Sequence, residues 1–119
     1  MKVLIVDDSS TVRQQVRMAL TNAGFDVVEA CDGAEGFEKV QSAAPSVVIC
    51  DVNMPRMNGI EMVEKIKASG GSVPIVMLTT EGQPELIQRA RAAGAKGWIV
   101  KPFKPELLVG AVTKLGKAA

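Results

Sequence analysis

Five short hydrophobic runs recur along the chain, separated by longer stretches that mix hydrophobic and polar residues. The runs are rich in β-branched residues and too short for helices, so they predict β-strands. They comprise residues 2–6 (KVLIV), 26–30 (DVVEA), 46–50 (SVVIC), 74–78 (PIVML) and 98–100 (WIV). All but the second lack polar alternation, which is typical of strands buried on both faces of a sheet.

The stretch after each run predicts an amphipathic helix, because its hydrophobic residues recur at helical spacing. The five predicted hydrophobic faces contain Val12, Val16, Ala19 and Leu20; Ala34, Phe37 and Val40; Ile60, Val63 and Ile66; Leu86, Ala90 and Ala93; and Leu107, Leu108, Ala111 and Leu115.

Strands that alternate with helices predict right-handed crossovers and a parallel sheet covered on both faces. The sequence therefore predicts an α/β fold with a doubly wound, five-stranded parallel sheet. Asp26 and Glu29 make the second strand the most polar, so we expect it at an edge. A length of 119 residues, with 47% hydrophobic residues, fits one domain that spans residues 1–119.

The composition excludes several kinds of chemistry. Histidine is absent, so the chain has no Ser/His/Asp triad, no histidine general base and no imidazole zinc ligand. Three Phe and one Trp are too few for the stacking platform of a single-strand binder, and we expect no nucleic-acid partner.

The sequence contains neither a hydrophobic run near the roughly 20 residues that span a bilayer nor a cleavable signal. We therefore expect a cytoplasmic protein without membrane contact. Cys31 and Cys50 form no CxxC pair, and we expect both to be reduced thiols packed at strand ends.

Polar residues gather where the predicted strands end. In a doubly wound sheet, ligands bind beyond the carboxyl ends of the strands, near the switch in strand order. If the first and third strands are neighbours, about 4.8 Å apart, three Asp side chains converge there. The residues at these ends are Asp7 and Asp8 after the first strand, Asp51 after the third, Thr79 and Thr80 after the fourth, and Lys101 after the fifth.

Three carboxylates in one crevice require a cation. Two such charges about 4 Å apart repel by roughly 4 kcal/mol at an effective dielectric constant of about 20. An incomplete set of hard oxygen ligands suits Mg²⁺, and Lys101 would add a second positive charge. The arrangement fits Asp51 as a nucleophile toward a phosphoryl group whose oxygens also meet the Thr79 hydroxyl.

Each of these residues also has a structural explanation when it is taken alone. Asp8 or Ser9 could cap the first helix, Lys101 could be a solvated surface residue, and Thr79 could be a hydroxyl at a strand end. The combination of all of them at four strand ends favours a site.

Four segments resemble the receiver domain of bacterial two-component response regulators, most closely the stand-alone, chemotaxis-type regulators. They are LIVDDSSTVR, VVICDVNMPRMNG, MLTTEG and GWIVKPF, and the resemblance runs from Lys2 to about Leu115. It implies a flavodoxin-like (βα)5 fold with strand order 2-1-3-4-5. It also implies a signalling switch that catalyses only its own phosphorylation and dephosphorylation.

The resemblance implies roles for the residues around the acidic crevice. Asp51 would be the phosphoacceptor, and Asp7 and Asp8 would be the acidic pair that holds Mg²⁺ together with Asp51. Asn53 would add a ligand through its backbone carbonyl.

On the other side of the crevice, Thr79 would be the switch hydroxyl and Lys101 the lysine that is typical of the family. The bond between Lys101 and Pro102 resembles the family's cis peptide.

Three positions are expected to tune the switch. Trp98 stands where the family commonly has Tyr or Phe as a rotameric switch, and its larger indole leaves open a fixed surface anchor instead. Asn53 and Glu81 flank the phosphorylation site, at positions that in the family tune the access of water to the phosphoryl group. Both are polar, so we expect a phosphorylated state that lasts seconds to minutes.

The expected partners are a histidine kinase as phosphodonor and an output protein. Residues 1–59 carry five basic and eight acidic residues, whereas residues 84–119 carry seven basic and two acidic ones. The basic third covers the fourth helix, fifth strand and fifth helix, which the resemblance makes the output face. We expect a monomer, and output through a partner protein because the terminal GKAA supplies no DNA-binding helix.

A haloacid dehalogenase-like phosphatase is the alternative function, since it also uses Asp, Thr or Ser, Lys and Mg²⁺. That class places its nucleophile after the first strand and a second Asp two residues later, where this chain has Asn53. A nucleotide-binding module is weaker, because no GxGxxG or GxxxxGK[ST] loop is present. A receiver-like adaptor that takes no phosphate disagrees with the complete residue set.

Overall fold

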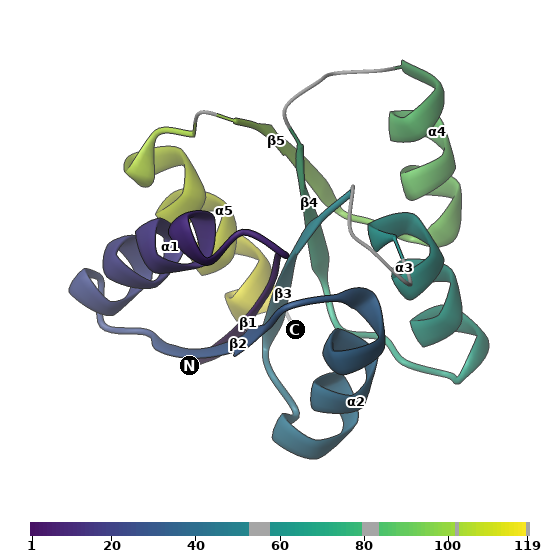
Figure 1. Cartoon of the computed structure of the whole chain (residues 1–119), viewed down its shortest axis with the longest axis horizontal. Coiled ribbons are helices and arrows are strands. Elements are labelled where there is room, and N and C mark those ends of the chain that lie inside the picture. Colours follow the sequence, from purple (N-terminus) through teal and green to yellow (C-terminus); the bar gives the residue numbers. More distant parts are fainter. Residues whose placement is uncertain (53–57, 80–83, 102, 119) are drawn as a thin grey trace.

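Strands and helices alternate along the chain (Figure 1). The computed structural model describes residues 1–52, 58–79, 84–101 and 103–118. The elements are β1 (Lys2–Val6), α1 (Ser10–Asn22), β2 (Asp26–Ala30), α2 (Gly33–Ala43), β3 (Val47–Asp51), α3 (Gly59–Ala68), β4 (Ile75–Thr79), α4 (Pro84–Ala93), β5 (Gly97–Val100) and α5 (Pro105–Ala118).

The strands form one parallel sheet in the order β2-β1-β3-β4-β5, which confirms the predicted fold class and strand order. The polar strand β2 lies at an edge, as expected from Asp26 and Glu29. The third and fourth strands begin and end one residue later than predicted. Asp51 and Thr79 are therefore the last residues of their strands and not the first residues beyond them.

Helices cover both faces of the sheet because the central strands are hydrophobic on both sides (Figure 1). On one face α2, α3 and α4 pack on a buried cluster that includes Leu4, Val48 and Met77. On the other, α1 and α5 pack on a second cluster that includes Ile5, Ile49 and Leu78.

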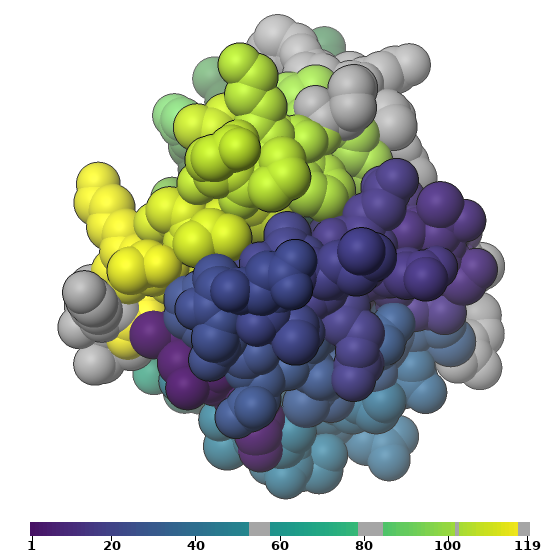
Figure 2. Space-filling view, turned by 90° about the vertical axis from the view of Figure 1, so that its left-hand side faces the viewer, coloured from purple at the N-terminus to yellow at the C-terminus, as the bar shows by residue number. Residues whose placement is uncertain are grey.

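The helices α1 and α5 lie side by side on their face of the molecule (Figure 2). A groove of about 720 Å³ there is lined mainly by hydrophobic side chains and reaches Lys101 at one end. The predicted hydrophobic face of α5 was wrong at one residue, because Leu107 is 62% exposed while Leu108 and Val112 are fully buried. The helix meets the sheet through the i, i+4 pair of Leu108 and Val112, and Leu107 is rotated away from it.

The side chain that caps α1 belongs to Ser9, whose Oγ accepts a hydrogen bond from the Val12 N–H at 3.3 Å. Capping by Ser9 leaves Asp8 without that structural role. The expectation that Asp8 or Ser9 caps the first helix is therefore confirmed for Ser9 and wrong for Asp8.

The expectation of packed thiols was right for one cysteine and wrong for the other. Both cysteines are free, but Cys31 is exposed at the end of β2, whereas Cys50 is buried in β3. An edge strand has neighbours on one side only, so a residue just past its end is easily left open to solvent. Among the described helices, none has the length and hydrophobicity needed to span a membrane.

Candidate functional site

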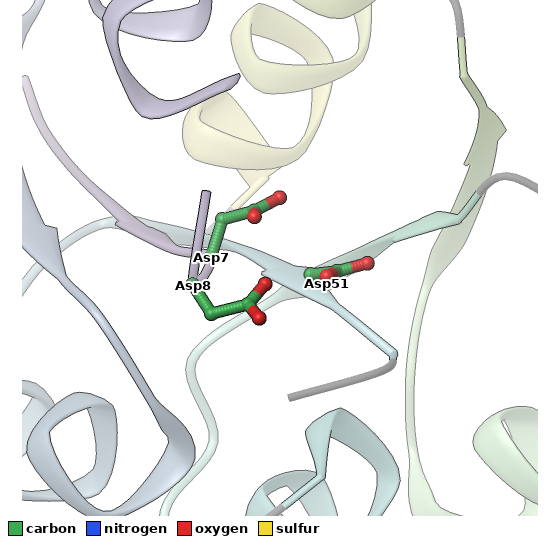
Figure 3. Close-up of side chains that lie close together, drawn as sticks. All are labelled: Asp7, Asp8 and Asp51. Carbon is green, nitrogen blue, oxygen red and sulfur yellow. The ribbon is translucent and has the colours of Figure 1, made fainter. Parts of the chain in front are cut away.

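Three aspartates from two neighbouring strands meet at the carboxyl edge of the sheet (Figure 3). Asp7 follows β1 and is fully buried, Asp51 ends β3 and is 6% exposed, and Asp8 is exposed to solvent. Each offers one carboxylate oxygen, and these three oxygens lie within 4.8 Å of one another. The convergence expected from the pairing of the first and third strands is confirmed.

Every polar group of Asp7 takes part in a hydrogen bond. Its N–H donates to the Ala30 carbonyl at 3.1 Å, and its carbonyl accepts from Arg13 Nη1 at 2.6 Å. On its carboxylate, Oδ1 accepts from the Ser9 N–H at 2.9 Å and Oδ2 accepts from Lys101 Nζ at 3.0 Å. The fully buried carboxylate is thereby fixed in direction, as burial of a charge requires.

Lys101 reaches the crevice from the end of β5 and lies between two aspartates. Its Nζ is 3.0 Å from Asp7 Oδ2 and 3.4 Å from Asp51 Oδ1, and its side chain is only 14% exposed. Burial lowers the pKa of this amine, but the hydrogen bond and charge of Asp7, helped by Asp51, outweigh burial and raise it. Lys101 is therefore a fixed positive charge of the crevice and not a solvated surface residue.

The Asp51 carboxyl is easier to protonate than an ordinary aspartate. Burial raises its pKa from the usual 3.8 to about 6, with a further contribution from the Asp7 charge, while Lys101 acts in the opposite direction. One lysine thus does not compensate the crowding of three carboxylates. A divalent cation with hard oxygen ligands fits this donor set, because it would relieve the repulsion that the lysine leaves.

The neighbouring thiol has no part in this chemistry. Cys50 is fully buried, and burial together with the charges of Asp51 and Asp7 raises its pKa well above the ordinary value for a thiol. A protonated, inaccessible thiol is a poor nucleophile and a poor metal ligand.

Several predicted site residues fall outside the described part of the chain. Asn53, Glu81 and Pro102 lie there, so the carbonyl ligand, the tuning of hydrolysis and the cis peptide stay predictions. Thr79 is described as the last residue of β4, opposite Val100 of β5, and its switch role is also a prediction.

Trp98 lies in β5 and packs partly buried against the cluster beneath α2, α3 and α4. Its indole Nε1 is buried and has no hydrogen-bond acceptor among the described residues. The ring is thus partly buried against the core, and the fixed anchor stays an alternative to the rotameric switch. Its rotation on phosphorylation stays a prediction.

Sequence reasoning missed Arg13, which donates to the backbone of Asp7 and also pairs with Glu29 of β2. Nothing in the spacing distinguishes this arginine from Arg17 one turn later. The backbone carbonyl that it contacts leaves no signal in the sequence.

Comparison with known proteins agrees with the fold and the acidic crevice. The family model described as "response regulator receiver domain" matches residues 3–113. The chain therefore belongs to the response regulator receiver family, whose members act as phosphorylation-dependent signalling switches. This family match gives no support to the haloacid dehalogenase alternative.

Within this family, the chain is similar to chemotaxis proteins. It is 45% identical to "Chemotaxis protein CheY1" of Helicobacter pylori strain J99 over 112 residues, which cover 91% of this chain and 90% of that protein. It is 38% identical to "Chemotaxis protein CheY" of Thermotoga maritima over 117 residues, covering 98% of each. The solved structure of chemotaxis protein CheY4 of Vibrio cholerae superposes with a TM-score of 0.90 at 46% identity, covering 96% of this chain and 97% of that one.

Proposed function

We propose that this chain is a phosphorylation switch in which the Asp51 carboxylate accepts a phosphoryl group. The observation that carries the proposal is the crevice itself, where three aspartates converge against one nearly buried lysine. Asp51 is the last residue of its strand at the crevice. Lys101 Nζ lies 3.4 Å from its carboxylate, slightly farther than from that of Asp7. Membership of the receiver family supports the same assignment.

Asp7, Asp8 and Asp51 would hold Mg²⁺ through carboxylate oxygens, and we propose the Asn53 backbone carbonyl as a further ligand. The bound ion would neutralise charge on the equatorial oxygens of the transferring phosphoryl group. Lys101 supplies positive charge from the side of β5. Asp51 attacks as a carboxylate, and with a pKa of about 6 it needs no general base at neutral pH.

The phosphodonor is proposed to be a phosphohistidine on a separate kinase, because this chain contains no histidine. The P–N bond of the donor breaks, its electron pair stays on the imidazole nitrogen, and a P–O bond forms to Asp51. Water later attacks the phosphorus, the P–O bond to Asp51 breaks with its electron pair left on the carboxylate, and inorganic phosphate is released. The chain therefore catalyses only its own modification. Polar Asn53 and Glu81 support a phosphorylated state that lasts seconds to minutes.

The output face is proposed to comprise α4, β5 and α5, with Thr79 and Trp98 as its switch residues. Val100 of β5 and Leu107 of α5 are 47% and 62% exposed. Among the side chains that the structure describes, the exposed basic residues of this region are Arg89, Arg91, Lys96, Lys104 and Lys114, and Arg89 is paired with Glu64 of α3. Hydrophobic and basic groups on one face fit an acidic, amphipathic segment of a partner protein.

We further propose that the chain is a monomer and acts in the cytoplasm. The free thiols of Cys31 and Cys50 support that location, because reduced cysteines are typical of that compartment.

Intact-mass spectrometry with a small phosphodonor tests the proposed function. Wild-type protein incubated with acetyl phosphate and Mg²⁺ should gain the mass of one phosphoryl group. The Asp51→Asn variant, which keeps size and shape but loses the nucleophile, should gain none. A wild type that stays unmodified, or a variant modified to the same extent, would overturn the assignment.

A further inference from the structure

Arg13 joins the first turn of α1 to the backbone of the acidic pair. Its Nη1 donates a hydrogen bond of 2.6 Å to the Asp7 carbonyl, and its Nε donates to Glu29 Oε1 at 3.2 Å. The Asp7 carbonyl belongs to the peptide group between Asp7 and Asp8. Arg13 therefore holds the plane of the peptide from which both carboxylates project.

The guanidinium of Arg13 is itself held in place. Glu29 of the edge strand β2 accepts from Arg13 through one carboxylate oxygen and from Arg17 Nη1 through the other, at 2.7 Å. Lys39 of α2 donates to the backbone carbonyl of the same Glu29. The Arg13 side chain is 18% exposed, so solvent screens this contact less than it screens the Arg17 pair, where the arginine is 53% exposed.

The contacts of Asp7 and Asp8 are unequal. Asp7 is fully buried and fixed through its N–H and both carboxylate oxygens, whereas Asp8 is exposed at the rim. The direction of Asp8 therefore depends on the peptide that precedes it, and Arg13 fixes that peptide.

We infer that Arg13 is a positioning residue for the proposed Mg²⁺ site, which holds the Asp7–Asp8 peptide so that both carboxylates face Asp51. The inference rests on the proposed function, because it concerns affinity for the ion that this function requires. Arg13 touches neither Asp51 nor the carboxylates of the pair in any described contact, so its effect passes through the backbone.

Electrostatics alone predicts that Mg²⁺ affinity rises when Arg13 is removed. Removing a positive charge beside an acidic crevice makes the crevice more negative, which strengthens the binding of a cation. Positioning predicts weaker binding, because the ligands lose their common orientation. The direction of the change in Mg²⁺ affinity thus separates the two explanations.

Isothermal titration calorimetry with MgCl₂ measures that affinity directly, on full-length wild type and on Arg13→Ala. Arg17→Ala is the matched control, because it removes the same charge from the same helix. In the wild type, Arg17 contacts the same Glu29 but not Asp7. We expect Arg13→Ala to bind Mg²⁺ about tenfold more weakly, the loss typical of groups that orient metal ligands, and Arg17→Ala to bind at least as tightly as wild type.

Three further measurements separate positioning from loss of structure. Arg13→Lys keeps the charge and a donor and should recover part of the lost affinity. The phosphorylation rate of Arg13→Ala with acetyl phosphate should approach that of wild type at saturating Mg²⁺, because the nucleophile is unchanged. Urea unfolding without metal should give Arg13→Ala a lower midpoint than Arg17→Ala, since it loses the hydrogen bond to the Asp7 carbonyl as well as one contact of Glu29, but both variants should be fully folded without denaturant.

Each failure has a distinct meaning. If wild type binds Mg²⁺ and Arg13→Ala binds it equally or more tightly, the positioning role is wrong while the proposed function stands. Equal weakening in Arg13→Ala and Arg17→Ala would also overturn that role. A wild type that binds no Mg²⁺ would overturn both.

Discussion

Asp51 carries a charge that its surroundings disfavour until a cation compensates it. Burial and the charge of Asp7 both favour its protonated form, and Lys101 reverses only part of that preference because its shorter contact is with Asp7. The sequence predicted that the three aspartates and Lys101 meet at the crevice, because strand ends determine that. It did not predict how Lys101 divides its contacts, which depends on rotamers that no pattern encodes.

The pH dependence of stability tests the state of Asp51 without metal. In the folded chain its pKa is raised from 3.8 to about 6, so the native state binds this proton more tightly than the unfolded chain does. The resulting stabilisation is present below about pH 4 and is lost as pH rises through about 6, with an upper limit on the order of 2–3 kcal/mol. The free energy of unfolding of wild type, measured with urea, should therefore fall relative to that of Asp51→Asn as pH rises from 4 to 7.

Saturating Mg²⁺ should reverse that divergence near neutral pH, because an ion bound only by the native state stabilises it. A stability difference between wild type and Asp51→Asn that stays constant across this range would contradict the raised pKa.

At the scale of elements, helix α3 approaches the end of β3 so closely that only glycine fits at its first position. A Cβ built on Gly59 would lie 2.0 Å from the Asp51 carbonyl oxygen, and the Gly59 N–H donates to the Val52 carbonyl at 2.9 Å. Helix α3 begins with a capping box between Asn58 and Glu61, a spacing that sequence reasoning missed. The close approach of Gly59 to Asp51 leaves no signal in the sequence.

Gly59→Ala should therefore disturb both folding and the site. The added methyl group must displace the backbone that carries Asp51, at a cost of about 1–3 kcal/mol, and should slow modification by acetyl phosphate. Gly110→Ala in α5 is the matched control, since its Cβ would meet nothing within 4 Å, and it should stabilise the chain by about 0.5–1 kcal/mol. Thermal unfolding of both variants checks the opposite signs, and a neutral Gly59→Ala would contradict the close packing.

The elements also explain where sequence reasoning failed. Periodicity predicted the existence and type of all the described strands and helices, whereas the order of the strands in the sheet came from the resemblance to receiver domains. It misjudged Leu107, since one residue of helix rotation separates a buried position from an exposed one. The exposure of Cys31 likewise depends on the edge position of β2, which a local pattern does not contain.

At the scale of the whole molecule, the crevice and the proposed output face are joined by β4 and β5. Thr79 ends β4 beside Val100 of β5, and Trp98 lies two residues earlier in the same strand, packed against the core. A phosphoryl group adds nearly two negative charges at one end of this pair of strands. We therefore expect that movement of Thr79 toward the phosphoryl group first changes the surroundings of Trp98 and the position of α4.

Trp98 is the only tryptophan, so its fluorescence reports this coupling. Acetyl phosphate with Mg²⁺ should change the emission or the quencher accessibility of wild type, because the buried indole N–H changes its surroundings. Asp51→Asn under the same conditions should show no change. Unaltered emission in a sample that mass spectrometry shows to be phosphorylated would exclude Trp98 as a switch residue.

The most direct test of the central claim locates the phosphoryl group in the sequence. Reduction of the phosphorylated wild type with borohydride converts an acyl phosphate on aspartate to homoserine, which tandem mass spectrometry identifies in peptides. We predict that homoserine appears at position 51 alone, and only when Mg²⁺ was present. Homoserine at Asp7 or Asp8, or equal labelling without a divalent ion, would contradict the account of the acidic crevice as a magnesium-dependent acceptor site.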